Sequence, residues 1–171
     1  KTEDFKKSQP VHILDWACRA QRHVTRSTFA AELFAAGDAI DQGRLVAQIL
    51  YETERGELLP SEARNLRKQG GFIPMALYVD AMSVFAATSA TFIKIPAEKS
   101  LLCHVQFLRG LLDKKVLSAL VWIDTRDMSA DGLTKGSIDR SDLHKLMDGN
   151  QRFNQPLKSW TNKVQFTETK V

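Results

Sequence analysis

Short apolar runs that alternate with helical segments constrain the fold of this chain most strongly. Residues 76–79 (ALYV) form a short apolar run that is typical of a strand buried in a parallel sheet. A second strand is predicted at residues 116–125 (VLSALVWIDT), after a long helical segment. Parallel strands need a crossover connection, which is usually a helix. The order of elements therefore predicts an α/β fold with a partly parallel sheet.

The helical segments are predicted from the spacing of their apolar side chains. Ser27 or Thr28 is a suitable N-cap for a long helix that ends near Glu54, since apolar residues recur there at spacings of three, four or seven. Glycine at position 70 is a suitable stop for the helix that follows Pro60. Further helical segments are expected at residues 81–88, 97–115, 127–135 and 139–149.

The two ends of the chain differ from its middle. Residues 11–18 (VHILDWAC) are short, rich in β-branched residues and alternating, which predicts a strand. Residues 1–10 are polar and are interpreted as a lead-in segment. From residue 150 the chain is polar and has no clear period, so residues 150–171 are predicted to form an extended arm. One domain is expected, at residues 11–149.

Composition and charge set limits on the function. Apolar residues make up 43% of the 171 residues and charged residues 26%, as in ordinary globular domains. No run of about 18 apolar residues occurs, so no membrane span is expected. The net charge of +4 permits contact with a polyanion but does not require it. Cys18 and Cys103 lack metal-site spacing, and two reduced thiols fit an intracellular, reducing compartment such as the cytosol or an organelle matrix.

Three carboxylates occupy comparable positions at the ends of predicted elements. Glu32 lies in the first turns of the long helix, Asp80 ends the middle strand, and Asp131 opens a helix after the last strand. If the two strands are adjacent, all three side chains can meet at one edge of the sheet. Clustered carboxylates repel one another, and a divalent cation relieves this repulsion. Mg²⁺, which prefers carboxylates and water, is therefore the candidate cofactor.

Each of these acids also has a purely structural interpretation. A glutamate in the first turns of a helix is favoured by the helix dipole. An aspartate at a strand-to-helix junction is a common N-cap. Spacing alone therefore leaves a metal site and ordinary caps both open.

Three segments together carry a resemblance to a known family. They are VHILDWACRAQRHVTRSTFAAELFA at residues 11–35, LYVDAMSVFAA at residues 77–87 and VWIDTRDMSADGLTK at residues 121–135. In this order they resemble the ribonuclease H domain of copia-type retrotransposon polyproteins. The third segment is the most specific for this family. In it, a strand that contains a tryptophan leads to Ala-Asp and then to Leu-Thr-Lys.

The resemblance implies a fold and a reaction. The fold would be a ribonuclease H-like mixed sheet flanked by helices. Glu32, Asp80 and Asp131 would correspond to the second, third and fourth metal-binding carboxylates of the family. The family hydrolyses the RNA strand of an RNA/DNA hybrid with two Mg²⁺ ions. In the family, the first carboxylate lies on a strand ahead of the segment that resembles residues 11–18, so the first two strands and this acid are missing here.

The missing strands lead to two hypotheses for the function. Two absent strands would leave a gap of roughly 14 Å in the sheet, which a partner polypeptide can fill. The first hypothesis is a catalytically impaired domain that acts as a structural or nucleic-acid-contacting subunit of a larger assembly, with protein partners and with RNA or an RNA/DNA hybrid as a possible ligand. The alternative is an active Mg²⁺-dependent ribonuclease H whose first carboxylate lies in an upstream segment. A third possibility is a module that binds nucleic-acid duplexes without cleaving them.

Overall fold

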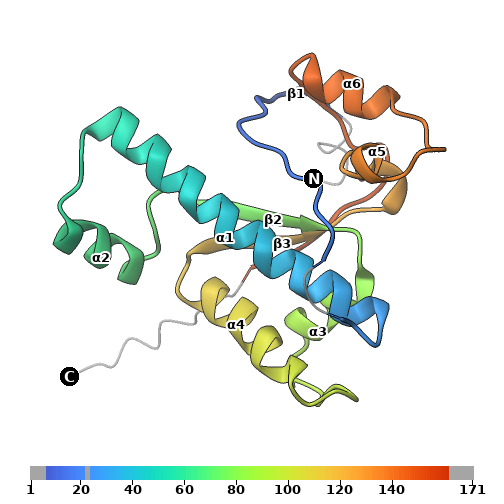
Figure 1. Ribbon diagram of the computed structural model, residues 1–171, viewed down its shortest axis with the longest axis horizontal. Helices are drawn as coiled ribbons and strands as arrows, with labels where there is room; N and C mark the ends of the chain where they lie inside the picture. Colours follow the sequence, from blue (N-terminus) through green and yellow to red (C-terminus); the bar gives the residue numbers. More distant parts are fainter. Residues whose placement is uncertain (1–6, 22–23, 162–171) are drawn as a thin grey trace.

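The computed structural model describes residues 7–21 and 24–161 and has a mixed α/β architecture, as the sequence predicts. In chain order the elements are β1 (Gln9–Pro10), α1 (Thr28–Arg55), α2 (Pro60–Lys68), β2 (Met75–Val79), α3 (Met82–Ser89), α4 (Leu101–Asp113), β3 (Leu117–Trp122), the short 3-10 helix η2 (Thr125–Asp127), α5 (Asp131–Thr134), α6 (Ser141–Met147), β4 (Asn150–Gln151) and β5 (Lys158–Trp160). Helices α1, α3 and α4 pack against a small sheet, and α5 and α6 lie beyond one end of its strands (Figure 1).

The main sheet has three strands in the order β2-β3-β5. β2 and β3 are parallel, with Leu77 opposite Leu120, and β5 is antiparallel to β3. The sheet is therefore mixed, and the predicted parallel pair is confirmed. In the part of the chain that the structure describes, β2 pairs with β3 alone and its other edge has no neighbouring strand. A separate two-stranded ribbon joins β1 to β4.

The long helix α1 forms where its cap and apolar spacing predict it. The Ser27 hydroxyl accepts a hydrogen bond from the Ala30 amide at 3.1 Å, which satisfies one of the free N–H groups of the first turn. The helix ends at Arg55, and the residue that caps it, Gly56, has a φ of 92°, which is unfavourable for other residues. Its second half projects from the sheet together with α2 (Figure 1). No helix among the described residues combines the length and apolar character needed to cross a bilayer.

The hydrophobic core lies between one face of the sheet and helices α1, α3 and α4. Leu77 and Leu120 face this layer from the two parallel strands. Leu33 from α1, Val84 from α3 and Leu108 from α4 are at most 2% exposed. Each fully buried side chain of this kind stabilises the fold by about 1.5–3 kcal/mol relative to an exposed one. This layer holds the start of α1 against the ends of the strands.

The prediction of a strand at residues 11–18 was wrong. Residues 11–21 form no strand, and Leu14 and Trp16 are 55% and 70% exposed. The segment is instead tethered to α1, because the Gln42 side chain donates to Asp15 and the Gln21 side chain donates to the Ala31 carbonyl. Alternating side chains favour a strand only where a second strand supplies the ladder of hydrogen bonds. No described strand lies beside this segment.

The residues predicted as a polar arm contribute to the sheet as far as they are described. β5 extends the sheet beyond β3, and Trp160 packs against the hydrophobic core. On the way to β5, the Phe153 ring stacks on Tyr78 with 5.7 Å between the ring centres. Tyr78 alternates with the core residues of β2, so this stack covers the opposite face of the sheet. Residues 162–171 of the predicted arm lie outside the described residues.

A buried aspartate anchors the segment that leads to β5. Asp127, which is 4% exposed, accepts hydrogen bonds from the Asn154 amide at 3.0 Å and the Gln155 amide at 2.7 Å through one oxygen. Its other oxygen accepts from the Asn154 side chain at 3.1 Å. A buried carboxylate that accepts several hydrogen bonds is a strong tether. The Asp127 side chain therefore fixes the path of the chain into the third strand.

Replacement of Asp127 by alanine is expected to lower the free energy of unfolding by about 1–3 kcal/mol, because it leaves buried donors without a partner. Urea denaturation of both proteins measures the difference. Asp139→Ala is the matched control, since Asp139 also accepts from a backbone amide, that of Ser141, but is exposed. Equal losses in the two variants would show that the Asp127 tether has no special role.

Candidate functional site

The structure brings the three predicted acids into one electrostatic neighbourhood. Asp80 directly follows β2, Asp131 is the first residue of α5, and Glu32 lies in the second turn of α1. Partial burial raises the pKa of Glu32 above its ordinary value of 4.5, and the negative charges of Asp80 and Asp131 raise it further. The positive charge of Lys135 acts on this pKa in the opposite direction. The four side chains therefore interact although they are far apart in sequence.

Asp80 is held in place by the pairing of the two parallel strands. Its backbone carbonyl accepts a hydrogen bond from the Trp122 indole N–H at 2.9 Å. The Ile123 amide donates to the Val79 carbonyl, also at 2.9 Å, so the ladder continues to the end of β2. These two hydrogen bonds hold the backbone of Val79 and Asp80 against Trp122 and Ile123, at the end of β3. Asp80 therefore has a defined position at the end of the sheet.

Asp131 is positioned by the packing of α5 against α6. Gly132 is buried, and a Cβ atom at this position would lie 3.0 Å from a methyl carbon of Leu143. The Arg140 side chain also donates to the Gly132 carbonyl at 3.0 Å. A Cβ atom at position 132 would require the Leu143 side chain to shift by a few tenths of an ångström, so glycine permits the close contact between α5 and α6. The side chain of Asp131 is only 13% exposed.

Lys135 is the member of the cluster that sequence reasoning missed. Its ammonium nitrogen lies 2.6 Å from Asp131 Oδ2. The hydrogen bond to Asp131 raises the pKa of Lys135, and the charges of Asp80 and Glu32 raise it further. The sequence analysis used Lys135 only as the last residue of the Leu-Thr-Lys part of the resembling segment. One signal in the sequence could have predicted this ion pair. Asp131 and Lys135 are four residues apart in a predicted helical segment, a spacing at which opposite charges meet.

The donor chemistry of the cluster fits Mg²⁺, but the present arrangement is not a complete ligand set. Carboxylate oxygens are the ligands that this cation prefers. Within residues 7–21 and 24–161, no three acidic, histidine or cysteine side chains are placed so that they could hold one metal ion together. The cluster therefore consists of Glu32, Asp80 and Asp131, which interact electrostatically, and of Lys135, which forms an ion pair with Asp131.

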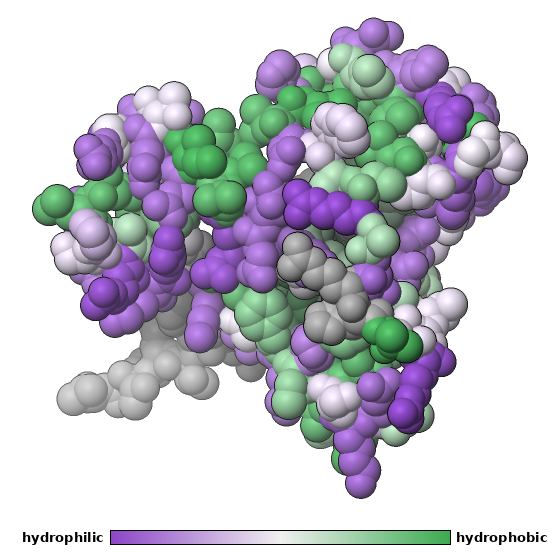
Figure 2. Space-filling model, in the orientation of Figure 1, coloured by the Kyte–Doolittle hydropathy of each residue, from purple (hydrophilic) through white to green (hydrophobic). Residues whose placement is uncertain are grey.

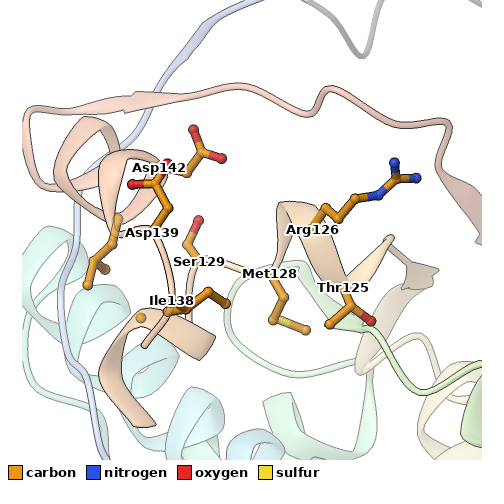
Figure 3. A pocket seen from close by; sticks show the side chains of 9 residues that line it. Thr125, Arg126, Met128, Ser129, Ile138, Asp139 and Asp142 are labelled. Atoms are coloured by element: carbon orange, nitrogen blue, oxygen red, sulfur yellow. The ribbon is translucent and has the colours of Figure 1, made fainter. Parts of the chain in front are cut away.

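A surface pocket of about 280 Å³ lies beside this cluster, between η2, α5 and α6 (Figure 3). In Figure 3 the Asp139 and Asp142 carboxylates lie on one side of it, while the Arg126 guanidinium points away from them. Arg126 binds Asp124 instead, and this hydrogen bond lowers the pKa of Asp124 to about 2. The pocket is lined by Thr125, Arg126, Met128, Ser129, Gly132, Ile138, Asp139, Asp142 and Leu143, so none of the three predicted acids contributes to it.

Hydrophobic side chains reach the surface in several places. Figure 2 shows hydrophobic groups among hydrophilic ones over this face of the molecule, including the region of α1 and α2 and that of α6. The exposed apolar residues in α1 and α6 are Leu45, Ile49 and Met147, and Leu59 is exposed directly before α2. Single exposed apolar residues are common in monomeric proteins and need no explanation. Apolar exposure on the helices alone therefore does not identify a binding site.

Comparison of the chain with protein-family models, with curated proteins and with solved structures finds no match. The function is therefore inferred from the residues themselves. Three observations bear on it: the acidic cluster, the Lys135–Asp131 ion pair, and the edge of β2 that has no described neighbouring strand.

The raised pKa of Glu32 predicts that Glu32→Gln stabilises the protein at pH 7 in the presence of a chelator. The folded protein holds the Glu32 proton more tightly than the unfolded chain does. The stabilising contribution of this group is thus present below about pH 4.5 and lost as the pH rises through the raised pKa. The melting temperature of Glu32→Gln should exceed that of the wild type at pH 7, with a smaller difference at pH 4.

Glu54→Gln removes the same charge from an exposed position near the other end of α1 and serves as the control. A Glu32→Gln variant that is no more stable than the wild type at pH 7 would contradict the predicted repulsion among the three acids.

Proposed function

We propose that this chain is a retroelement-derived ribonuclease H-like domain with an impaired acidic site, which acts as a structural or nucleic-acid-contacting subunit of a larger assembly. The observation that carries the proposal is the electrostatic interaction of Glu32 on α1 with Asp80 at the end of β2 and Asp131 on α5, with Lys135 paired to Asp131. Ligand sites of α/β sheets commonly lie at the carboxyl ends of their strands. The same three residues correspond to metal-binding acids in the family resemblance.

Impaired catalysis is inferred from the residues beside the cluster. The resemblance implies a first carboxylate on a strand next to β2, and no described strand lies there. Asp15, on the segment that precedes α1, is exposed and hydrogen-bonded to Gln42. Loss of one ligand weakens the positioning of a metal pair, and the reaction rate falls with it.

Glu32, Asp80 and Asp131 are the residues that would hold Mg²⁺ in this proposal. When bound, the cation would activate water and stabilise the charge that develops on a phosphodiester. The role of the protein chain is to bring the carboxylates together. The pairing of β2 with β3 fixes the position of Asp80, and the contact between α5 and α6 fixes that of Asp131. Lys135 already pairs with Asp131 Oδ2 at 2.6 Å, so this carboxylate has a cationic partner in the chain itself.

The proposed role in an assembly is supported by the open edge of β2. Backbone groups at a free sheet edge readily pair with a strand of another polypeptide. The segment before α1 also offers a partner surface, since it forms no strand and exposes Leu14 and Trp16. A protein partner that adds strands to β2 and covers these side chains would remove both exposed features.

The alternative is an active Mg²⁺-dependent ribonuclease H whose first carboxylate lies in an upstream segment. The observation that favours it is the raised pKa of Glu32, caused by burial and by the charges of Asp80 and Asp131. An acid whose pKa is raised by burial and by neighbouring charges is frequent at catalytic sites. A divalent cation would relieve the repulsion, as expected for a functional metal site.

A labelled RNA/DNA hybrid distinguishes the two functions. We expect the wild-type chain to bind the hybrid in a salt-sensitive manner, since phosphate contacts release counterions, and not to cleave it in Mg²⁺. Fluorescence anisotropy at low and physiological salt measures binding, and gel electrophoresis of the labelled RNA measures cleavage. The RNA strand alone is the control ligand.

Mg²⁺-dependent cleavage that disappears in Glu32→Gln and in Asp80→Asn would contradict the proposed impairment and establish the alternative. Absence of hybrid binding at low salt would contradict the nucleic-acid contact and leave a purely structural role.

A further inference from the structure

We propose that a basic patch at the end of the sheet opposite the acidic cluster binds the phosphate backbone of nucleic acid. The basic patch consists of five side chains: Arg44, Arg67, Lys68, Lys114 and Lys115. It lies where β2 and β3 begin, whereas Asp80 follows the end of β2. The inference goes beyond the proposed function, since it assigns the nucleic-acid contact to a second surface. It rests on that function only for the choice of an RNA/DNA hybrid as one probe.

Two turns of the chain bring the lysines of the basic patch together. Gly70 follows the end of α2, and a Cβ atom at this position would lie 3.4 Å from the Lys114 carbonyl oxygen and 3.5 Å from that of Lys115. The φ of Gly70 is 113°, which favours glycine, so the chain can turn here directly against the loop between α4 and β3. In Figure 1, α2 lies toward the start of β2, and α5 and α6 lie beyond its other end. Two segments that are remote in sequence therefore place their lysines at the same end of the sheet.

Two arginines extend the basic patch toward α1. The Arg44 and Arg67 side chains line the same small surface hollow. Arg67 donates a hydrogen bond to Gln48 Oε1 at 2.7 Å, and its guanidinium carbon lies 5.9 Å from the centre of the Phe72 ring. The Gln48 amide donates in turn to Glu52 at 2.7 Å, so it binds both the acid and the guanidinium group. The Arg67 side chain is therefore held in place by an amide and a ring, and a planar guanidinium group suits a phosphate.

The positive charges of the basic patch exceed the negative charges beside them. Among residues 7–21 and 24–161, neither the Lys68 nor the Lys114 ammonium group forms an ion pair. Arg44 lies 3.7 Å from Asp41, whose side chain is 69% exposed, and such exposed pairs are weak. Asp113 is a further acid that adjoins the patch in sequence. A local excess of positive charge on one surface attracts a polyanion.

Stabilisation of helix ends accounts for only part of the basic patch. Cations near the last turn of a helix are favoured by the helix dipole, as for Lys68 at the end of α2 and Lys114 after α4. Arg44, however, lies in the interior of α1. Lys115 has a φ of 57°, a conformation that glycine or asparagine adopts more easily. The helix dipoles therefore do not explain why all five cations share one surface.

The spread of these cations favours a nucleic-acid backbone over a single small anion. They come from three segments at the start of two strands, so their ligand must carry several negative charges along its length. The phosphates of a duplex provide such a row, and contacts with them require no particular base sequence. β2 has five residues at about 3.3 Å each, so about 16 Å of strand separate the basic patch from Asp80. Binding at the patch therefore needs neither the acidic cluster nor a divalent cation.

The test compares two double variants of the full chain in EDTA. Lys68→Gln/Lys114→Gln removes two charges from the basic patch and leaves Lys115, with its unusual backbone conformation, unchanged. Lys94→Gln/Lys99→Gln is the matched control, because it removes two exposed lysine charges from the loop between α3 and α4. Fluorescence anisotropy at several salt concentrations measures binding of a labelled RNA/DNA hybrid and of a labelled DNA duplex of the same sequence. Thermal melting followed by circular dichroism verifies the fold of each variant.

We expect the patch variant to bind both duplexes about tenfold or more weakly than the control variant at low salt, since each lost phosphate contact reduces the release of counterions. The slope of log affinity against log salt concentration should fall by about two, one unit for each lysine. Lys68→Arg/Lys114→Arg keeps both charges and should bind like the wild type. A role confined to the helix ends would lower the melting temperature without this change of slope.

Equal affinities and equal salt slopes of the patch and control variants would overturn the inference and attribute binding to net charge. Absence of wild-type binding to either duplex at low salt would overturn it as well. Unlabelled DNA duplex and poly-glutamate serve as competitors for the bound hybrid. Displacement by poly-glutamate at a lower concentration of charge than by the duplex would assign the patch to an acidic protein partner instead.

The two labelled duplexes separate this inference from the proposed function. Binding of the DNA duplex through the basic patch, without binding of the hybrid, would refute the hybrid contact and support the patch. Hybrid binding that is the same in the patch and control variants would refute the patch and leave the hybrid contact in place.

Discussion

Parallel pairing of β2 with β3 is the interaction on which the rest of the structure depends. It places Leu77 opposite Leu120 in the core and brings the carboxyl ends of both strands to the same edge. Asp80 leaves the sheet at that edge, where its carbonyl is held by the Trp122 indole. The chain that leaves β3 turns through η2 into α5, which carries Asp131. Without this pairing, Glu32 on α1 would have no acidic neighbours.

Among the described residues, the two outer edges of this strand pair differ: one is covered by a further strand and the other is not. β5 covers the outer edge of β3, and it arrives there because the buried Asp127 carboxylate holds the segment at Asn154 and Gln155. The outer edge of β2 has no equivalent among the described residues. The acidic cluster lies at the end of this half-covered sheet, so an added strand at β2 would also approach the carboxylates. Partner binding and the chemistry of the site are therefore linked in the proposed function.

Long-range contacts explain where the sequence predictions were limited. The alternation of residues 11–18 indicates a strand as strongly as the run in β2 does, yet only β2 has a neighbour that completes its hydrogen bonds. The polar residues around Lys158 carry no strand pattern and nevertheless join the sheet, because Trp160 reaches the core and Asp127 tethers the chain. In both cases a partner far away in sequence decided the outcome.

The amino-acid sequence by itself determined the elements whose causes are local: the Ser27 cap and apolar stripe of α1, the buried runs of β2 and β3, and the placement of Asp80 after β2 and of Asp131 at the start of a helix. Only the tertiary structure decided which of these groups interact. The electrostatic repulsion between Glu32 and the two aspartates, Asp80 and Asp131, depends on the distances between α1, the end of β2 and α5. Charge interactions act through space, and a linear pattern contains no distances between remote residues.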